Sequence, residues 1–203
     1  MTLWGPHVLV AFLSLTTVPT LAGQGFGTTA AATGQELFLS EPLNPYAKGT
    51  VFVYRASGSG WNEVAQLQAA DGDLLDRLGR TLSVSGRRLL IGATSIDSAR
   101  GTEYLFERDG AGSWKQTAKL VAAGSKAGDS FGRLVLLQGN RAFVASWGRN
   151  DGRGVMTTWT NAGGQWTKEA TLAASDPAAN DFFGSAMAAD GERLRNSDRN
   201  LVP

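Results

Sequence analysis

The sequence predicts an all-β protein made of about three four-stranded antiparallel units. Three observations carry this prediction: a pattern that returns every 52 or 53 residues, short segments rich in β-branched and aromatic residues, and glycine at the breaks between them. Glycine accounts for 26 of the 203 residues without a G-X-Y period, which indicates many tight turns rather than collagen.

The repeat keeps one register at three independent markers. These are a tryptophan, an apolar residue followed by glycine, and a glycine in a turn. They fall at Trp61, Trp114 and Trp166; at Leu78-Gly79, Phe131-Gly132 and Phe183-Gly184; and at Gly86, Gly139 and Gly191. The sequence therefore divides into a partial copy (33–48) and three copies (49–100, 101–153 and 154–193). Residues 194–203 form a polar, aberrant tail, because their Arg and Asn residues cannot line a buried strand.

Each copy is expected to supply four short strands. In the first full copy the strand-like segments are 50–55, 61–68, 80–85 and 88–93, and a leading strand at 36–41 precedes them. Four antiparallel strands in about 50 residues are the size of a β-propeller blade, and stacked blades bury faces that one sheet alone would leave wet. Known propellers have about four to eight blades, so three predict an incomplete propeller.

Short motifs in this register resemble the FG-GAP repeats of integrin α-type β-propellers, in the form found in bacterial secreted proteins. The motif is clearest at Asp129-Ser130-Phe131-Gly132 and Asp181-Phe182-Phe183-Gly184, whereas Asp76-Arg77-Leu78-Gly79 has Leu in place of Phe. The GA half stands at Ile91-Gly92-Ala93 and is blurred at Val144-Ala145-Ser146. The resemblance implies a β-propeller used for binding or adhesion, usually outside the cell.

The composition argues against an enzyme. The chain has no Cys and a single His, His7, so the part after a cleaved leader could build neither a Ser-His-Asp or Cys-His relay nor a His-ligated metal site. Carboxylate pairs and Ser-Lys arrangements remain open. The net charge of +1 gives no electrostatic footprint for nucleic acid.

The N-terminus has the pattern of a secretory signal peptide at residues 1–22. The apolar run Val8 to Leu15 is too short to span a bilayer, and Thr20 and Ala22 place small residues at the positions a signal peptidase reads. No Lys or Arg precedes the run, which leaves an uncleaved anchor or a misassigned start as alternatives. The expected location is extracellular or at the cell surface, with no stable membrane insertion after cleavage.

The best ligand-contact candidate is the loop that contains Trp147, Arg149, Asn150 and Asp151. A non-periodic Trp beside Arg, Asn and Asp is the composition of a recognition loop. In the alternative interpretation, the Trp packs against the neighbouring blade and the polar residues face water. The periodic Trp residues, and the aromatic series Tyr54, Phe106 and Trp159, are expected to pack between blades rather than to stack on sugars.

No cofactor is expected, and calcium is only weakly indicated. The resemblance places calcium in the acidic loop, where Asp71, Asp73 and Asp76 are the best candidates but lack the D-x-[DN]-x-[DN]-G spacing. For Asp76, Asp129 and Asp181 we expect a structural role: an Asp two residues before the Phe-Gly pair can accept a backbone N–H bond and fix the turn.

The leading functional hypothesis is an extracellular binding or adhesion-type module that contacts protein or glycan through blade-edge loops. One alternative is a carboxylate-based glycan hydrolase on a propeller scaffold. Another is a non-functional fragment of a larger propeller. The sequence also leaves open a homo-oligomer, or further blades that complete the ring.

Overall fold

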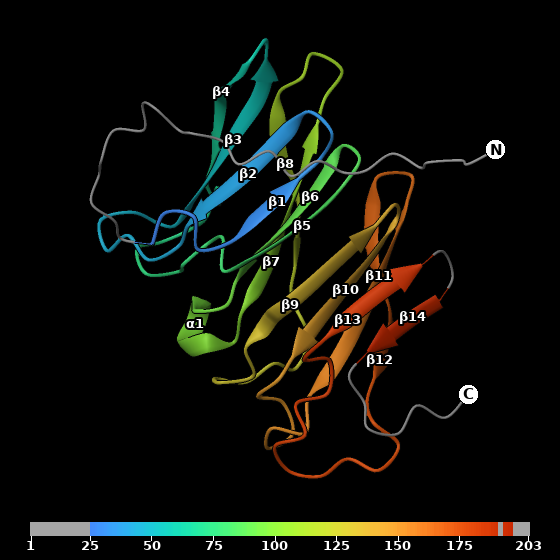
Figure 1. Cartoon of the computed structure of the whole chain (residues 1–203). Helices are drawn as coiled ribbons and strands as arrows, with labels where there is room; N and C mark the ends of the chain where they lie inside the picture. Colours follow the sequence, from blue (N-terminus) through green and yellow to red (C-terminus); the bar gives the residue numbers. More distant parts are fainter. Residues whose placement is uncertain (1–24, 191–192, 197–203) are drawn as a thin grey trace, which may run out of the picture.

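The chain forms three four-stranded antiparallel sheets and one two-stranded sheet, stacked in chain order (Figure 1). The computed structural model describes residues 25–190 and 193–196. The first sheet holds β1 (Ala30–Ala32), β2 (Glu36–Glu41), β3 (Thr50–Ser57) and β4 (Gly60–Leu67); the second holds β5 (Thr81–Ser85), β6 (Arg88–Ala93), β7 (Thr102–Arg108) and β8 (Trp114–Leu120); the third holds β9 (Phe131–Gln138), β10 (Arg141–Ser146), β11 (Val155–Ala162) and β12 (Gln165–Leu172); the last holds β13 (Met187–Asp190) and β14 (Arg193–Asn196).

Every sheet runs in simple order, each strand pairing with the one before it. The first strands contact one another in series, β1 with β5, β5 with β9 and β9 with β13. A short helical turn, α1 (Ile96–Ala99), joins β6 to β7. This arrangement confirms the predicted all-β, incomplete propeller. The predicted signal peptide at residues 1–22 lies outside the described residues.

The sheets are out of phase with the sequence copies. Copy 49–100 supplies β3 and β4 to the first sheet and β5 and β6 to the second. Each copy therefore bridges two sheets, and the loop with the Phe-Gly motif is the crossing between them. Strand β1 was not predicted, because its three alanines have low β propensity. The segment expected to be a tail begins inside β14, whose Arg193 and Arg195 are exposed.

Apolar side chains from facing sheets meet in three layers. We call the face of each sheet toward the preceding sheet its front and the opposite face its back. Phe38 and Val53 on the back of the first sheet pack on Leu89, Ile91 and Tyr104 on the front of the second. In the same way, the back of the second sheet packs on the front of the third. There, the cluster includes Leu90, Leu105, Ala142 and Val144. Phe143 and Met156 then pack under Met187 and Leu194 of the last sheet. The predicted burial of blade faces against neighbours is confirmed.

Two of the periodic tryptophans pack between sheets. Trp114 is 8% exposed, and its ring meets Phe38 edge-on at 5.2 Å between centroids. Trp166 packs on the second layer, beneath the Arg88 guanidinium. Both observations confirm the packing role expected from their periodicity.

The front face of the first sheet has no described sheet before it. It carries five half-buried apolar or aromatic residues: Leu37, Leu39, Phe52, Tyr54 and Trp61. Their equivalents in the second sheet are buried against the sheet in front: Leu89, Ile91, Tyr104, Phe106 and Trp114. The face therefore has the chemistry of a sheet-to-sheet contact.

At every crossing, a glycine lies directly against the backbone of the Phe-Gly motif. A Cβ added to Gly101 would lie 2.0 Å from the Phe131 carbonyl oxygen, and one added to Gly154 would lie 2.6 Å from the Phe183 nitrogen. Gly49 is equally close to Leu78, at 2.4 Å. All three have positive φ, between 78° and 85°. The close approach allows the Phe131 N–H to donate to the Arg100 carbonyl at 2.9 Å.

We predict that Gly101→Ala destabilises the fold by more than about 2 kcal/mol. The left-handed backbone alone costs an L-residue roughly 1–2 kcal/mol, and the clash with Phe131 adds to it. The matched control is Gly164→Ala, which has a similar φ of 88° and nothing within 4 Å of the added Cβ. Urea denaturation of both variants measures the difference, and equal losses would show that the contact contributes nothing.

Candidate functional site

The antiparallel topology gives the stack two different rims. The turns between first and second strands, and between third and fourth strands, lie at one end, which we call the hairpin rim. The connections between second and third strands, and the crossings between sheets, lie at the other end, which we call the loop rim. The loop rim includes α1 and residues 147–154 (Figure 1).

The three motif aspartates hold the crossings in shape. In each loop a carboxylate oxygen accepts the backbone N–H three residues earlier: Asp76 from Asp73 at 2.6 Å, Asp129 from Lys126 at 2.8 Å, and Asp181 from Ala178 at 2.6 Å. The expected turn-fixing role of these aspartates is confirmed.

The calcium candidates do not come together as a ligand set. Asp71 forms an ion pair with Lys119 of β8 at 2.6 Å, and the hydrogen bond from Lys119 lowers the pKa of the Asp71 carboxyl. Asp76 is engaged within its own turn. Among residues 25–190 and 193–196, no cluster of three or more His, Cys, Asp or Glu could hold a metal ion. Calcium binding at Asp71, Asp73 and Asp76 stays a prediction.

Trp147 sits at the loop rim between the third and last sheets. Its ring is half-buried, its indole N–H donates to the Gly184 carbonyl at 3.1 Å, and the Arg133 guanidinium lies over it at 5.2 Å from the centroid. Trp147 and Arg133, together with Arg80, Thr81 and Thr94, line a pocket of about 210 Å³. One edge of the Trp is thus anchored to the neighbouring sheet while its ring helps to form a polar pocket.

The polar residues after Trp147 form a turn in which Arg149 is half-buried and the next two residues are exposed. Asn150 and Asp151 are both exposed and have positive φ, 56° and 59°. Arg149 donates to the Ala123 carbonyl at 3.3 Å. The structure therefore places Arg149, Asn150 and Asp151 on one protruding turn next to Trp147.

A buried carboxyl lies at the second crossing, beneath the surface of the loop rim. Glu103 of β7 is fully buried, and among the described residues neither of its oxygens has a hydrogen-bond partner. The Glu103 carboxyl lies directly over the motif glycine Gly132: a Cβ added to Gly132 would be 1.5 Å from Glu103 Oε1. Burial raises the pKa of Glu103 well above its usual value. The equivalent positions, Val51 and Met156, are apolar.

A second pocket lies at the hairpin rim between the first two sheets. It encloses about 380 Å³, and three arginines line it: Arg55, Arg87 and Arg108. These arginines were not predicted from the sequence. The signal that could have found them is their register, since the third sheet has the neutral residues Asn140 and Asn161 at the positions of Arg87 and Arg108.

Comparison with known families agrees with this geometry. The FG-GAP repeat matches residues 61–106, 114–157 and 166–194, which is more than half of the chain. The chain belongs to the FG-GAP repeat family. A search of curated proteins found no match. FG-GAP repeats occur in integrin-like adhesion and binding modules, typically in extracellular, non-enzymatic proteins. Within the described residues, no helix is long and apolar enough to cross a membrane.

We predict that Glu103→Met stabilises the protein at pH 7 by about 1–3 kcal/mol, the cost of an unpartnered buried polar group. Glu103→Gln keeps a buried polar side chain and removes only the titrating group. Because the pKa is raised in the folded state, the wild-type stability is fully present below the unfolded pKa and falls as pH rises above it. Urea denaturation between pH 4 and 8 should show this fall in the wild type and a flatter profile in both variants. The exposed control Glu63→Gln should keep the wild-type slope. A variant profile as steep as the wild type would contradict the assignment.

Proposed function

We propose that this chain is an extracellular, non-enzymatic binding module that contacts a protein or glycan ligand through its loop rim. The observation that carries the proposal is the position of Trp147, whose ring lines a polar pocket beside the protruding turn at Arg149, Asn150 and Asp151. A rigid aromatic ring surrounded by adaptable polar groups is the composition of many recognition surfaces. The family match supports a binding role.

Arginine next to the ring adds specificity. Arg133 stacks on Trp147, and Arg80 lines the same pocket. Stacked guanidinium groups keep their outer N–H donors available for the oxygen atoms of a ligand. The rim would therefore favour a ligand with an apolar face and hydrogen-bond acceptors around it, as in a sugar ring or a peptide backbone.

Two side chains of the turn after Trp147, the half-buried Arg149 and the exposed Asp151, test the role of the rim. Arg149→Gln with Asp151→Asn keeps the turn, because Asn tolerates the positive φ at position 151. We predict at least a tenfold loss of binding to an array of purified polysaccharides and extracellular proteins, measured with protein secreted into the medium and checked for an N-terminus at Gly23. Binding equal to that of the wild type would contradict the proposed role of these two residues in ligand contact.

The matched control changes the same two charges elsewhere. Lys168→Gln with Asp190→Asn alters two exposed residues outside the rim and should bind like the wild type. Equal losses in both double variants would indicate an unspecific charge effect.

A second copy of this chain is our proposed partner for the front face of the first sheet. The three internal contacts join an apolar front to an apolar back. The last sheet, however, has the exposed Arg195 where the other backs have Phe38, Leu90 and Phe143, so it is a poor cover for an apolar face. Two front faces meeting across a two-fold axis would match apolar with apolar.

We predict that the protein sediments with at least twice the mass of one chain, and that Leu39→Glu makes it monomeric by burying a charge in the contact. Analytical ultracentrifugation at several concentrations measures this. Leu172→Glu is the control, because it lies on the third sheet and should leave the mass unchanged. A monomeric wild type would overturn the proposed self-association.

A further inference from the structure

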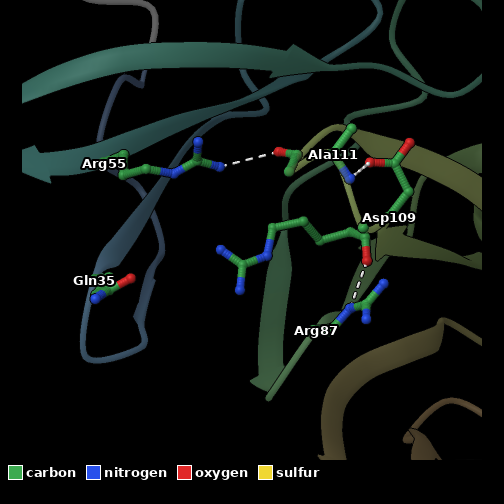
Figure 2. A pocket seen from close by; sticks show the side chains of 8 residues that line it. Gln35, Arg55, Arg87, Asp109 and Ala111 are labelled. Carbon is green, nitrogen blue, oxygen red and sulfur yellow. Dashed lines mark hydrogen bonds between the residues drawn. The ribbon is translucent and has the colours of Figure 1, made fainter.

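The arginine pocket is assembled by the tips of two neighbouring sheets at the hairpin rim. Gln35 comes from the turn before β2 and Arg55 from β3, while Arg87, Arg108 and residues 109–112 come from the turns and strand ends of the second sheet. Figure 2 shows Gln35 and Arg55 on one side of the opening and Arg87 and Asp109 on the other. The pocket volume of about 380 Å³ is within the range of small-ligand sites.

A single buried carboxylate serves two of the three guanidinium groups. Glu36 is 1% exposed, and its Oε1 accepts from Arg55 Nη2 at 2.6 Å and lies 3.3 Å from Arg108 Nη1. Arg55 also donates to the Gly112 carbonyl at 3.0 Å. These contacts fix the two side chains in place, and they leave one negative charge against two positive charges.

The third guanidinium adds to the surplus. Arg87 donates from Nε to the Arg108 carbonyl at 2.7 Å, and no described carboxylate pairs with it. Asp109, the acidic residue in the pocket lining, forms an ion pair with Lys115 at 3.0 Å and accepts N–H bonds from Ala111 and Ser113. The pocket is therefore positive, and its arginines are held in place by neighbouring groups.

The next junction along the stack carries less of this charge, because its pocket sets Arg87 and Arg88 against Glu107. The positions of Arg87 and Arg108 are taken there by Asn140, which accepts from Arg88 at 2.5 Å, and Asn161, which accepts from the Gly164 N–H at 3.2 Å. The Glu36–Arg55 ion pair is replaced by Arg88–Glu107 at 2.7 Å, with the signs reversed. The framework is thus the same at both junctions, and the first junction has the larger surplus of arginine, with Arg55, Arg87 and Arg108 in its lining.

We propose that this pocket binds an anionic sugar residue, through its carboxylate or sulfate group, from an acidic polysaccharide. Guanidinium groups match both anions with paired N–H donors. The lining has one apolar side chain, Ala111, and otherwise offers arginine, amide, carboxylate and glycine backbone. Peptide recognition relies on apolar and aromatic anchors, which this pocket lacks, so a hydroxyl-rich anion fits it better than an acidic peptide. The site is at the opposite rim from Trp147 and does not depend on the binding role proposed there.

The test uses the whole chain and substitutions that its own third sheet already contains. The variants are Arg87→Asn and the double variant Arg87→Asn/Arg108→Asn. They introduce the asparagines that stand at the equivalent positions Asn140 and Asn161. The control double variant, Lys126→Gln/Lys168→Gln, removes two positive charges from exposed positions outside the pocket. Far-UV circular dichroism and urea denaturation check that all variants fold. Arg87→Asn keeps the test valid if loss of Arg108 unfolds the protein, since the Glu36–Arg55 pair stays intact.

Isothermal titration calorimetry with an oligogalacturonate and a heparin-derived hexasaccharide separates the carboxylate from the sulfate source. Neutral maltohexaose and a poly-glutamate peptide are the comparison probes. We expect one acidic sugar to bind with at least tenfold loss in both Arg87 variants, and with no loss in the control or in Arg149→Gln/Asp151→Asn. Equal loss in the control, tighter binding of poly-glutamate, or no binding of either acidic sugar would overturn the proposal.

Discussion

The close contact between a glycine and the backbone of the Phe-Gly motif sets the spacing of the whole stack. Gly49, Gly101 and Gly154 each directly precede the third strand of a sheet. Each lies against the first residue of the Phe-Gly motif, on the crossing to the next sheet. A side chain at any of these positions would hold the sheets apart and open the apolar layer between them. Because packing attraction falls steeply with even a small gap, the layers depend on this contact.

The same constraint separates binding chemistry from structural chemistry. The crossings are occupied by turn-fixing aspartates and by glycines without room for a side chain, and the residues that we propose for ligand contact lie between these fixed positions. At the loop rim these residues are Trp147 and the turn after it. At the hairpin rim they are Arg87 and Arg108, where the next sheet has asparagine. A repeated framework with copy-specific rim residues suits a binding protein.

Much of the fold could be predicted from the sequence because the markers in the repeat are the residues that the packing requires. Period, strand positions, the role of the motif aspartates and the burial of Trp114 and Trp166 all follow from residue type and register. The sequence could not show which four consecutive strands form one sheet, since a repeat of four strands has the same period wherever a sheet begins. The register distinguishes Arg87 and Arg108 from their counterparts in the next sheet, but it does not predict a pocket, because Arg55 and Arg108 lie on different sheets and meet through Glu36 only after the sheets stack.

Native-state hydrogen exchange at the crossings tests the central claim most directly. The Phe131 and Phe183 amides donate to the Arg100 and Arg153 carbonyls at 2.9 and 3.0 Å, in segments that would otherwise be loop. If the glycine contact holds the stack together, these amides should exchange as slowly as those of the central strands β6 and β10, through global unfolding. Exchange at the fast rate of the exposed hairpin turns would show that the sheets are held together by their apolar layers alone.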